Sequence, residues 1–109
     1  MSRTISTNEL QTLLKTQPDI FLIDIRRKND YDADTQKILG AQWRNPDEIA
    51  QWSDTLPKNK ELVVYCARGS SVSNAAVDHL LGQQRQVRYI EGGIEAWKNS
   101  GGATTEKTK

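Results

Sequence analysis

The residue best suited to chemistry in this chain is Cys66, the only cysteine among 109 residues. The run from Leu62 to Tyr65 before it is apolar and β-branched, which predicts a buried strand that ends at the cysteine. Gly69 and two serines then indicate a turn. Apolar residues at helical spacing from Val72 to Leu81 predict a helix. We therefore expect the thiol in a short loop between the end of a strand and the N-terminus of a helix.

A helix N-terminus favours an ionised thiol. Its first backbone N–H groups have no partner within the helix, and the helix dipole adds about half a positive charge. A free thiol, with a pKa of about 8.5, is only about 3% ionised at pH 7, and a neighbouring cation such as Arg68 increases that fraction. The same N–H groups can hold an anionic substrate or a persulfide. The pattern thus favours a reactive Cys66 over a buried apolar cysteine that only ends a core strand.

Other polar residues near strand ends are candidates for the site, and a structural role is favoured for most of them. Asp24 interrupts the apolar run 20–25, which is typical of a strand buried on both faces. A buried carboxylate needs partners, and Arg26 is near enough to pair with it and fix the end of the strand. Arg26 and Arg27 are also candidates for holding an anion. His79, the only histidine, lies well inside the predicted helix, which favours a partly exposed structural residue over a catalytic base.

The composition is that of one small domain. The chain is 36% hydrophobic, enough for one modest core, and we expect a domain over residues 1–100 and a flexible tail over 101–109. A net charge of +1 gives no electrostatic case for binding nucleic acid or an anionic membrane surface. No apolar run is long enough to cross a bilayer and no secretory signal is visible, which favours the cytoplasm. One cysteine and one histidine exclude a Cys/His zinc site within the chain, and we expect no metal and no cofactor.

Predicted strands and helices alternate along the chain. Ser6 and Glu9 form a capping box that begins a first helix, and Gly82 is expected to end the helix that follows Cys66. The predicted strands cover residues 20–25, 62–65 and 87–90. This order predicts a small α/β domain with a mainly parallel sheet and helices on both faces. Ligands of such sheets bind at the carboxyl ends of the strands, where Cys66 lies.

Four segments, spread over nearly the whole chain, resemble the rhodanese-like domain family. They are Ile23-Asp24-Ile25-Arg26, Ile38-Leu39-Gly40-Ala41, Val64-Tyr65-Cys66 with the loop to Ser71, and Tyr89-Ile90-Glu91-Gly92-Gly93 followed by Ala96-Trp97. The segments occur in the order that the family has. The stretch 41–46 is also similar to a bacterial single-domain subgroup. The resemblance implies a rhodanese-like α/β fold and the chemistry of a thiosulfate sulfurtransferase.

The resemblance also implies roles for individual residues. In that family the loop cysteine takes up a sulfane sulfur as a persulfide and passes it to cyanide or a thiol, so Cys66 would be the nucleophile. The substrate-binding loop would comprise Ala67, Arg68, Gly69, Ser70 and Ser71. The expected partners are a small sulfur-containing anion as donor and cyanide, a thiol or a protein thiol as acceptor. Because the loop has one basic residue, a polysulfide or a protein persulfide stays open as the donor beside thiosulfate.

Two other function classes fit part of the pattern. Phosphatases and arsenate reductases of the same fold class need a Cys-x₅-Arg loop, in which the arginine grips a tetrahedral oxyanion. Here the sixth residue after Cys66 is Val72, which argues against that chemistry. A non-catalytic sulfur-carrier or protein-binding rhodanese-like module stays open, although the presence of the cysteine favours the enzyme.

Overall fold

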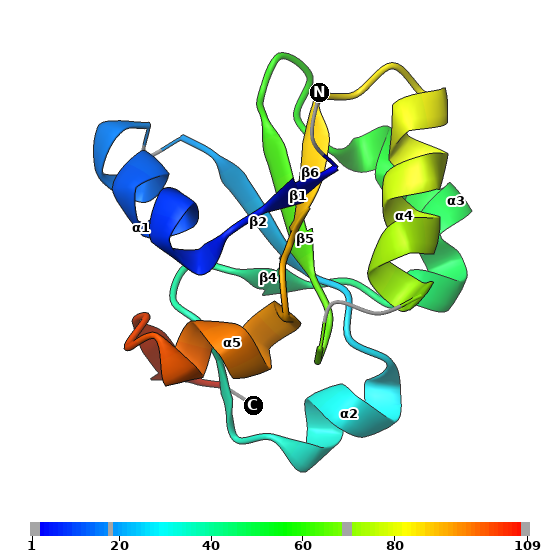
Figure 1. Cartoon of the computed structure of the whole chain (residues 1–109). Helices are drawn as coiled ribbons and strands as arrows, with labels where there is room; N and C mark the ends of the chain where they lie inside the picture. Colours follow the sequence, from blue (N-terminus) through cyan, green and yellow to red (C-terminus); the bar gives the residue numbers. More distant parts are fainter. Residues whose placement is uncertain (1–2, 18, 69–70, 108–109) are drawn as a thin grey trace.

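The computed structural model describes residues 3–17, 19–68 and 71–107, and a five-stranded parallel sheet forms its centre (Figure 1). The strands are β1 (Thr4–Ile5), β2 (Phe21–Asp24), β3 (Gln36–Ile38), β4 (Gln42–Trp43), β5 (Leu62–Tyr65), β6 (Val87–Ile90) and β7 (Thr104–Glu106). The α-helices are α1 (Thr7–Thr16), α2 (Lys28–Ala33), α3 (Ile49–Trp52), α4 (Ser71–Gly82) and α5 (Gly93–Asn99). Two 3₁₀ helices, η1 (Pro46–Glu48) and η2 (Ser53–Thr55), flank α3. The central sheet has the order β1-β6-β5-β2-β4, and all of its pairs are parallel, which confirms the predicted fold class.

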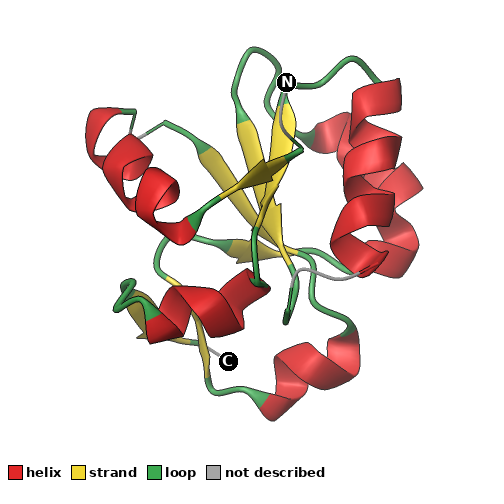
Figure 2. Cartoon of the chain, viewed as in Figure 1, coloured by secondary structure: helices red, strands yellow, loops and turns green. Residues whose placement is uncertain are grey.

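Helices cover both faces of this sheet, with α3 and α4 on one side and α1 and α5 on the other (Figures 1 and 2). The central strand β5 serves both layers because successive side chains of a strand point to opposite faces. Its Leu62 and Val64, followed by Cys66, belong to the core under α4, whereas Val63 and Tyr65 belong to the core under α1 and α5. Burial on both faces explains why this strand is a continuous apolar run.

The helix ends agree with the sequence at one position and differ from it at another. α1 begins at the predicted capping box: the Ser6 hydroxyl accepts from the Glu9 amide at 3.1 Å, and the Glu9 carboxylate accepts from the Ser6 amide at 3.2 Å. Gly82, in contrast, is still helical, and the left-handed residue is Gln84, with φ 63°. The helix therefore ends at Gly82, as predicted, but Gly82 is its last helical residue and not a left-handed residue just beyond the helix. A single exposed glutamine can take this conformation at a cost of about 1–2 kcal/mol.

The segment that we expected to be a flexible tail packs on the domain as far as residue 107. β7 pairs antiparallel with β3, so the expectation is wrong for residues 104–106, while residues 108–109 lie outside the described part. Gly101, with φ 83°, turns the chain, and Gly102 lies so close to the Trp97 ring that a Cβ would clash with it. The Trp97 indole N–H donates to the Ala103 carbonyl at 2.9 Å. Two glycines and one buried tryptophan thus bring the strand back onto the fold.

Candidate active site

Cys66 directly follows the central strand, at the carboxyl edge of the sheet. Its side chain is 3% exposed and belongs to the core under α4, together with Ala76 and Val77. The structure therefore has the predicted strand, loop and helix around the cysteine, with the thiol inside the domain. Burial and the loop position, which the sequence presented as alternatives, occur together here.

The N-terminus of α5 orients the backbone at the start of this loop. The carbonyls of Cys66 and Ala67 accept hydrogen bonds from the amides of Ile94 at 3.0 Å and Glu95 at 3.2 Å. In a trans peptide the carbonyl and the next N–H point in opposite directions. The N–H groups of Ala67 and Arg68 therefore point away from α5. Successive backbone N–H groups that point to the same side can together bind an anion.

A glycine makes this close approach between α5 and the loop possible. Gly93 has φ 63°, and a Cβ placed on it would lie 2.6 Å from the carbonyl carbon and 2.7 Å from the oxygen of Ala67. Gly92, with φ 75°, precedes it at the start of α5. The sharp turn of the Glu91-Gly92-Gly93 segment thus positions the loop backbone, in addition to beginning a helix.

Asp24 and Arg26 form a buried pair beside the loop, as the sequence suggested. Asp24 is 0% exposed and Arg26 is 2% exposed. The Arg26 guanidinium donates to the carboxylate from Nε at 3.1 Å and from Nη2 at 2.7 Å, in a forked geometry. The Tyr65 hydroxyl donates to the same carboxylate at 3.0 Å and accepts from the Ile38 amide at 3.1 Å. These contacts tie β2, β3 and β5 together at the edge where Cys66 lies.

A second carboxylate extends this network to α5. Asp34 accepts from Arg26 Nη1 at 2.9 Å and from Lys98 Nζ at 2.7 Å. Burial alone would raise the pKa of Asp34, but the hydrogen bonds from Lys98 and the Gln36 amide and the two cations outweigh it and lower that pKa. Burial likewise opposes the charge of Arg26, yet the hydrogen bond and charge of Asp24 raise the Arg26 pKa. Both Arg26 and Asp34 therefore stay charged at neutral pH.

Tyr65 remains a neutral hydroxyl within the same network. Burial is the main cause that raises the pKa of Tyr65, and the negative charge of Asp24 raises this pKa further. The phenol thus donates one hydrogen bond and accepts another, and it does not ionise. We term Asp24, Arg26, Asp34, Tyr65 and Lys98 the buried charge network, after its buried members Asp24, Arg26 and Tyr65; Asp34 is half-buried and Lys98 is exposed. The geometry of the network is structural, because every charge in it has a protein partner.

The structure describes some of the loop residues that we predicted to bind an anion, and it places them in different surroundings. Arg68 lies beside Cys66 in sequence, but its guanidinium pairs with Glu95 at 3.0 Å, and both side chains are exposed. An exposed pair of this kind is worth about 0–1 kcal/mol, so an incoming anion can compete for the arginine. Ser71 is the first residue of α4. Gly69 and Ser70 lie outside the described residues.

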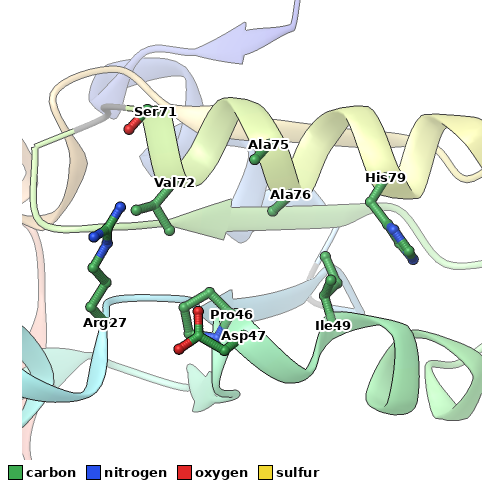
Figure 3. A pocket seen from close by; sticks show the side chains of 9 residues that line it. All are labelled: Arg27, Pro46, Asp47, Ile49, Ser71, Val72, Ala75, Ala76 and His79. Atoms are coloured by element: carbon green, nitrogen blue, oxygen red, sulfur yellow. The ribbon is translucent and has the colours of Figure 1, made fainter.

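A groove of about 430 Å³ runs along α4, on the same side of the sheet as Cys66 (Figure 3). We call it the α4 groove. On the α4 side it is lined by Ser71, Val72, Ala75, Ala76 and His79, and on the other side by Arg27, Pro46, Asp47 and Ile49.

The sequence did not single out Asp47 or the groove itself, since the segment at residue 47 meets α4 only in the folded chain. It raised Arg27 only as one of two arginines that might hold an anion, and the structure separates the two: Arg26 is buried and paired, while Arg27 borders the groove. The alternation of residues 23, 25 and 27 along one face was the signal that distinguishes them.

Neither a metal-binding cluster nor a helix able to span a membrane is found among the described residues. No group of three or more histidine, cysteine, aspartate or glutamate side chains is placed there to hold a metal ion. None of the helices in this part of the chain combines the length and the apolar character needed to span a membrane.

Comparison with known sequences identifies relatives of the chain. A model of the family described as "Rhodanese-like domain" matches residues 6–100. The chain is also 31% identical over 99 residues to the thiosulfate sulfurtransferase GlpE of Coxiella burnetii, covering 90% of this chain and 89% of that protein. The matched span includes the Asp24 strand, the Cys66 loop and the Gly93 turn.

Solved structures with the same fold agree with this match. A rhodanese-related protein from Thermoplasma volcanium superposes with a TM-score of 0.83 at 24% identity, over 96% of this chain and 99% of that one. A rhodanese-like domain protein from Staphylococcus aureus gives a TM-score of 0.80 at 24% identity, over 99% and 100%. With the parallel sheet, the cysteine at the end of its central strand and a family match over residues 6–100, the chain belongs to the rhodanese-like domain family.

Proposed function

We propose that this chain is a sulfurtransferase that carries a sulfane sulfur as a persulfide on Cys66. The observation that carries the proposal is the position of this cysteine at the start of a loop whose first N–H groups are turned away from α5. A negatively charged sulfur on Cys66 needs donors of this kind. The 31% identity to a thiosulfate sulfurtransferase supports the same class of reaction.

The proposed reaction has two displacements at sulfur. The Cys66 thiolate first attacks the sulfane sulfur of a small anionic donor. With thiosulfate, the S–S bond breaks, sulfite leaves with the electron pair, and the persulfide remains on the enzyme. An acceptor such as cyanide, a thiol or a protein thiol then attacks the outer sulfur, and the electron pair of the breaking bond returns to Cys66. In each step the sulfur atom and the electron pairs are exchanged between the donor, Cys66 and the acceptor alone, so the proposed reaction needs no cofactor.

The chain contributes position and charge to both steps. Backbone N–H groups of the loop from Ala67 to Ser71 stabilise the negative outer sulfur, which forms in the first step and is consumed in the second. Arg68 attracts the anionic donor, in competition with Glu95. The buried charge network acts as a positioning element, because it holds the ends of β2 and β5.

The proposal is tested by the intact mass of the purified protein before and after thiosulfate, and again after cyanide. We expect a gain of about 32 Da, the mass of one sulfur, that cyanide removes. A polysulfide is used in parallel because the single loop arginine does not restrict the donor to thiosulfate. Cys66→Ser is the control and should gain no cyanide-labile sulfur. No gain with either donor would contradict the proposal and favour a non-catalytic binding module.

A further inference from the structure

Two opposite charges border the α4 groove without pairing with each other. Arg27 and Asp47 both line the groove, and over the described residues neither side chain forms an ion pair. Only the backbone amide of Asp47 is engaged, by the Asn45 side chain at 3.0 Å. Some other charges near this edge of the sheet are paired, such as Arg26 with Asp24 and Arg68 with Glu95, whereas Asp30 also has no ion pair among the described residues. Two exposed, unpaired charges of opposite sign in one groove can serve a ligand that carries both.

The α4 groove adjoins the loop that begins at Cys66. Ser71, where that loop enters α4, lines the groove, and Figure 3 shows Ser71 and Arg27 at the same end of it. Ile23 and Ile25 belong to the same core as Cys66, and Arg27 continues this alternation on the α4 face. Cys66 itself does not line the groove. A ligand seated at the Arg27 end therefore lies next to the loop and on the same face as the thiol.

The rest of the lining suits the aliphatic part of a small ligand. Val72, Ala75, Ala76 and Ile49 form an apolar stretch along the groove. His79 lies at the far end, about 12 Å from Ser71 along the helix, and its buried Nε2 has no hydrogen-bond partner among the described residues. The volume of about 430 Å³ is ample for an amino acid at the Arg27 end.

We propose that the α4 groove binds the sulfur acceptor and that this acceptor is a small zwitterionic aminothiol. Its carboxylate would pair with Arg27 and its ammonium group with Asp47. The inference rests on the proposed function. In the transfer, the sulfur of the aminothiol attacks the outer sulfur of the Cys66 persulfide and the bond to Cys66 breaks. The electron pair of the acceptor sulfur forms the new S–S bond, the pair of the breaking bond stays with Cys66, and the proton of the acceptor thiol is taken up by the Cys66 thiolate. The aminothiol leaves as its own persulfide.

Binding is tested first, without any sulfur transfer. The ligand is S-methylcysteine, a zwitterion that has no free thiol, titrated into the unloaded protein and followed by ¹H–¹⁵N NMR. We expect amide shifts over residues 47–49 and 71–79, and affinity weakened about threefold to tenfold in both Arg27→Gln and Asp47→Asn. Lys60→Gln and Asp19→Asn make the same charge changes at the opposite edge of the sheet and should bind normally. An absence of shifts in the groove, or equal weakening in the control variants, would overturn the inference.

Selectivity is tested next, on persulfide-loaded protein. Four thiols are compared as acceptors. Cysteine carries both charges, and 3-mercaptopropionate carries only the carboxylate. Cysteamine carries only the ammonium group, and 2-mercaptoethanol carries neither charge. At equal thiolate concentration we expect transfer to cysteine to be the fastest. The ratio of the cysteine rate to the 2-mercaptoethanol rate should fall about threefold to tenfold in Arg27→Gln and in Asp47→Asn, and should stay unchanged in the two control variants.

Equal rates for the four thiols would overturn the inference but leave the proposed function intact. The two failures are separable, because loading of Cys66 is read from the mass before the acceptor is added. A protein that binds S-methylcysteine in the groove but never loads sulfur would contradict the proposed function and, with it, the acceptor role of the groove, while the binding of a zwitterion there would stand.

Discussion

Arg26 and Arg27 are adjacent and chemically identical, yet they lie in opposite environments. Arg26 is 2% exposed, and its guanidinium bonds to Asp24, Asp34 and the Gln36 carbonyl. Arg27 is exposed on the other side of the sheet, lines the α4 groove and has no ion pair among the described residues. The two residues lie in the short link between β2, which ends at Asp24, and α2, which begins at Lys28, and their side chains leave this link on opposite sides. A one-residue step thus separates a residue that holds the fold from one that is available to a ligand.

The two sides of the sheet at its carboxyl edge differ in the same way as these two arginines. On the α2 and α5 side, buried charges are satisfied by one another and fix the ends of β2, β3 and β5. Burying charges is costly, and partners with good geometry are needed to offset that cost. On the α4 side, Arg27 and Asp47 are exposed, have no ion pair among the described residues and border a groove. This contrast gives three predictions about stability, from the largest expected effect to the smallest.

Removing either arginine tests the contrast directly. Arg26→Ala leaves the buried Asp24 carboxylate without its main cation, so we expect a loss of about 3–5 kcal/mol in the free energy of unfolding. Arg27→Ala removes an exposed side chain without an ion pair and should change that free energy by less than about 0.5 kcal/mol. Urea unfolding followed by tryptophan fluorescence measures both. Similar losses in the two variants would show that the network does not stabilise the fold as we infer.

Two glycines with positive φ test how the α5 side holds the Cys66 loop. Gly93→Ala must accommodate a Cβ beside the carbonyl of Ala67, whereas Gly40, with φ 86°, has no atom within 4 Å of such a Cβ. Left-handed strain of about 1–2 kcal/mol applies to both variants. The clash with the loop backbone adds about 1–3 kcal/mol only in Gly93→Ala.

The same urea measurement compares the two glycine variants, and persulfide formation is measured alongside. We expect Gly93→Ala to load sulfur more slowly, because its clash displaces the loop backbone, and Gly40→Ala to load it at the normal rate. Equal stability and equal loading in the two variants would contradict the role assigned to the contact between α5 and the loop.

Much of the fold was predictable because it depends on local patterns. The capping box at Ser6 needs only residues three apart, and the continuous apolar run before Cys66 indicates a strand buried on both faces. The pairing of Asp24 with Arg26 was also predictable, since the two residues are separated by one position and a buried carboxylate needs a partner.

Features that depend on distant contacts were not predictable. Asp34 joins the buried charge network through Lys98, which is 64 residues away in the chain. The pairing of β7 with β3 depends on Trp97, whose ring meets the glycine turn only after α5 has packed on the sheet. The α4 groove likewise needs two segments that meet in the folded chain. The left-handed residue after α4 is Gln84 and not Gly82, because Gly82 is the last residue of the helix.

The smallest expected effect concerns the pH dependence of the buried charge network. The pKa of Asp34 is lowered in the folded protein, so the folded state favours the carboxylate more than the unfolded chain does. Stability from this group is therefore present above the unfolded pKa of about 3.9, and it is lost as the pH falls through the lower folded value.

We expect Asp34→Asn to be less stable than the native chain by about 1 kcal/mol at pH 7, through the lost pairs with Arg26 and Lys98. Urea unfolding at pH 7, 5 and 3 should show this difference narrowing only below about pH 4, because there the unfolded chain binds a proton at Asp34 that the native carboxyl takes up only at a lower pH. A difference that stays constant down to pH 3 would mean that the charge of Asp34 does not stabilise the network, and that its hydrogen-bond geometry alone holds the α5 side of the site.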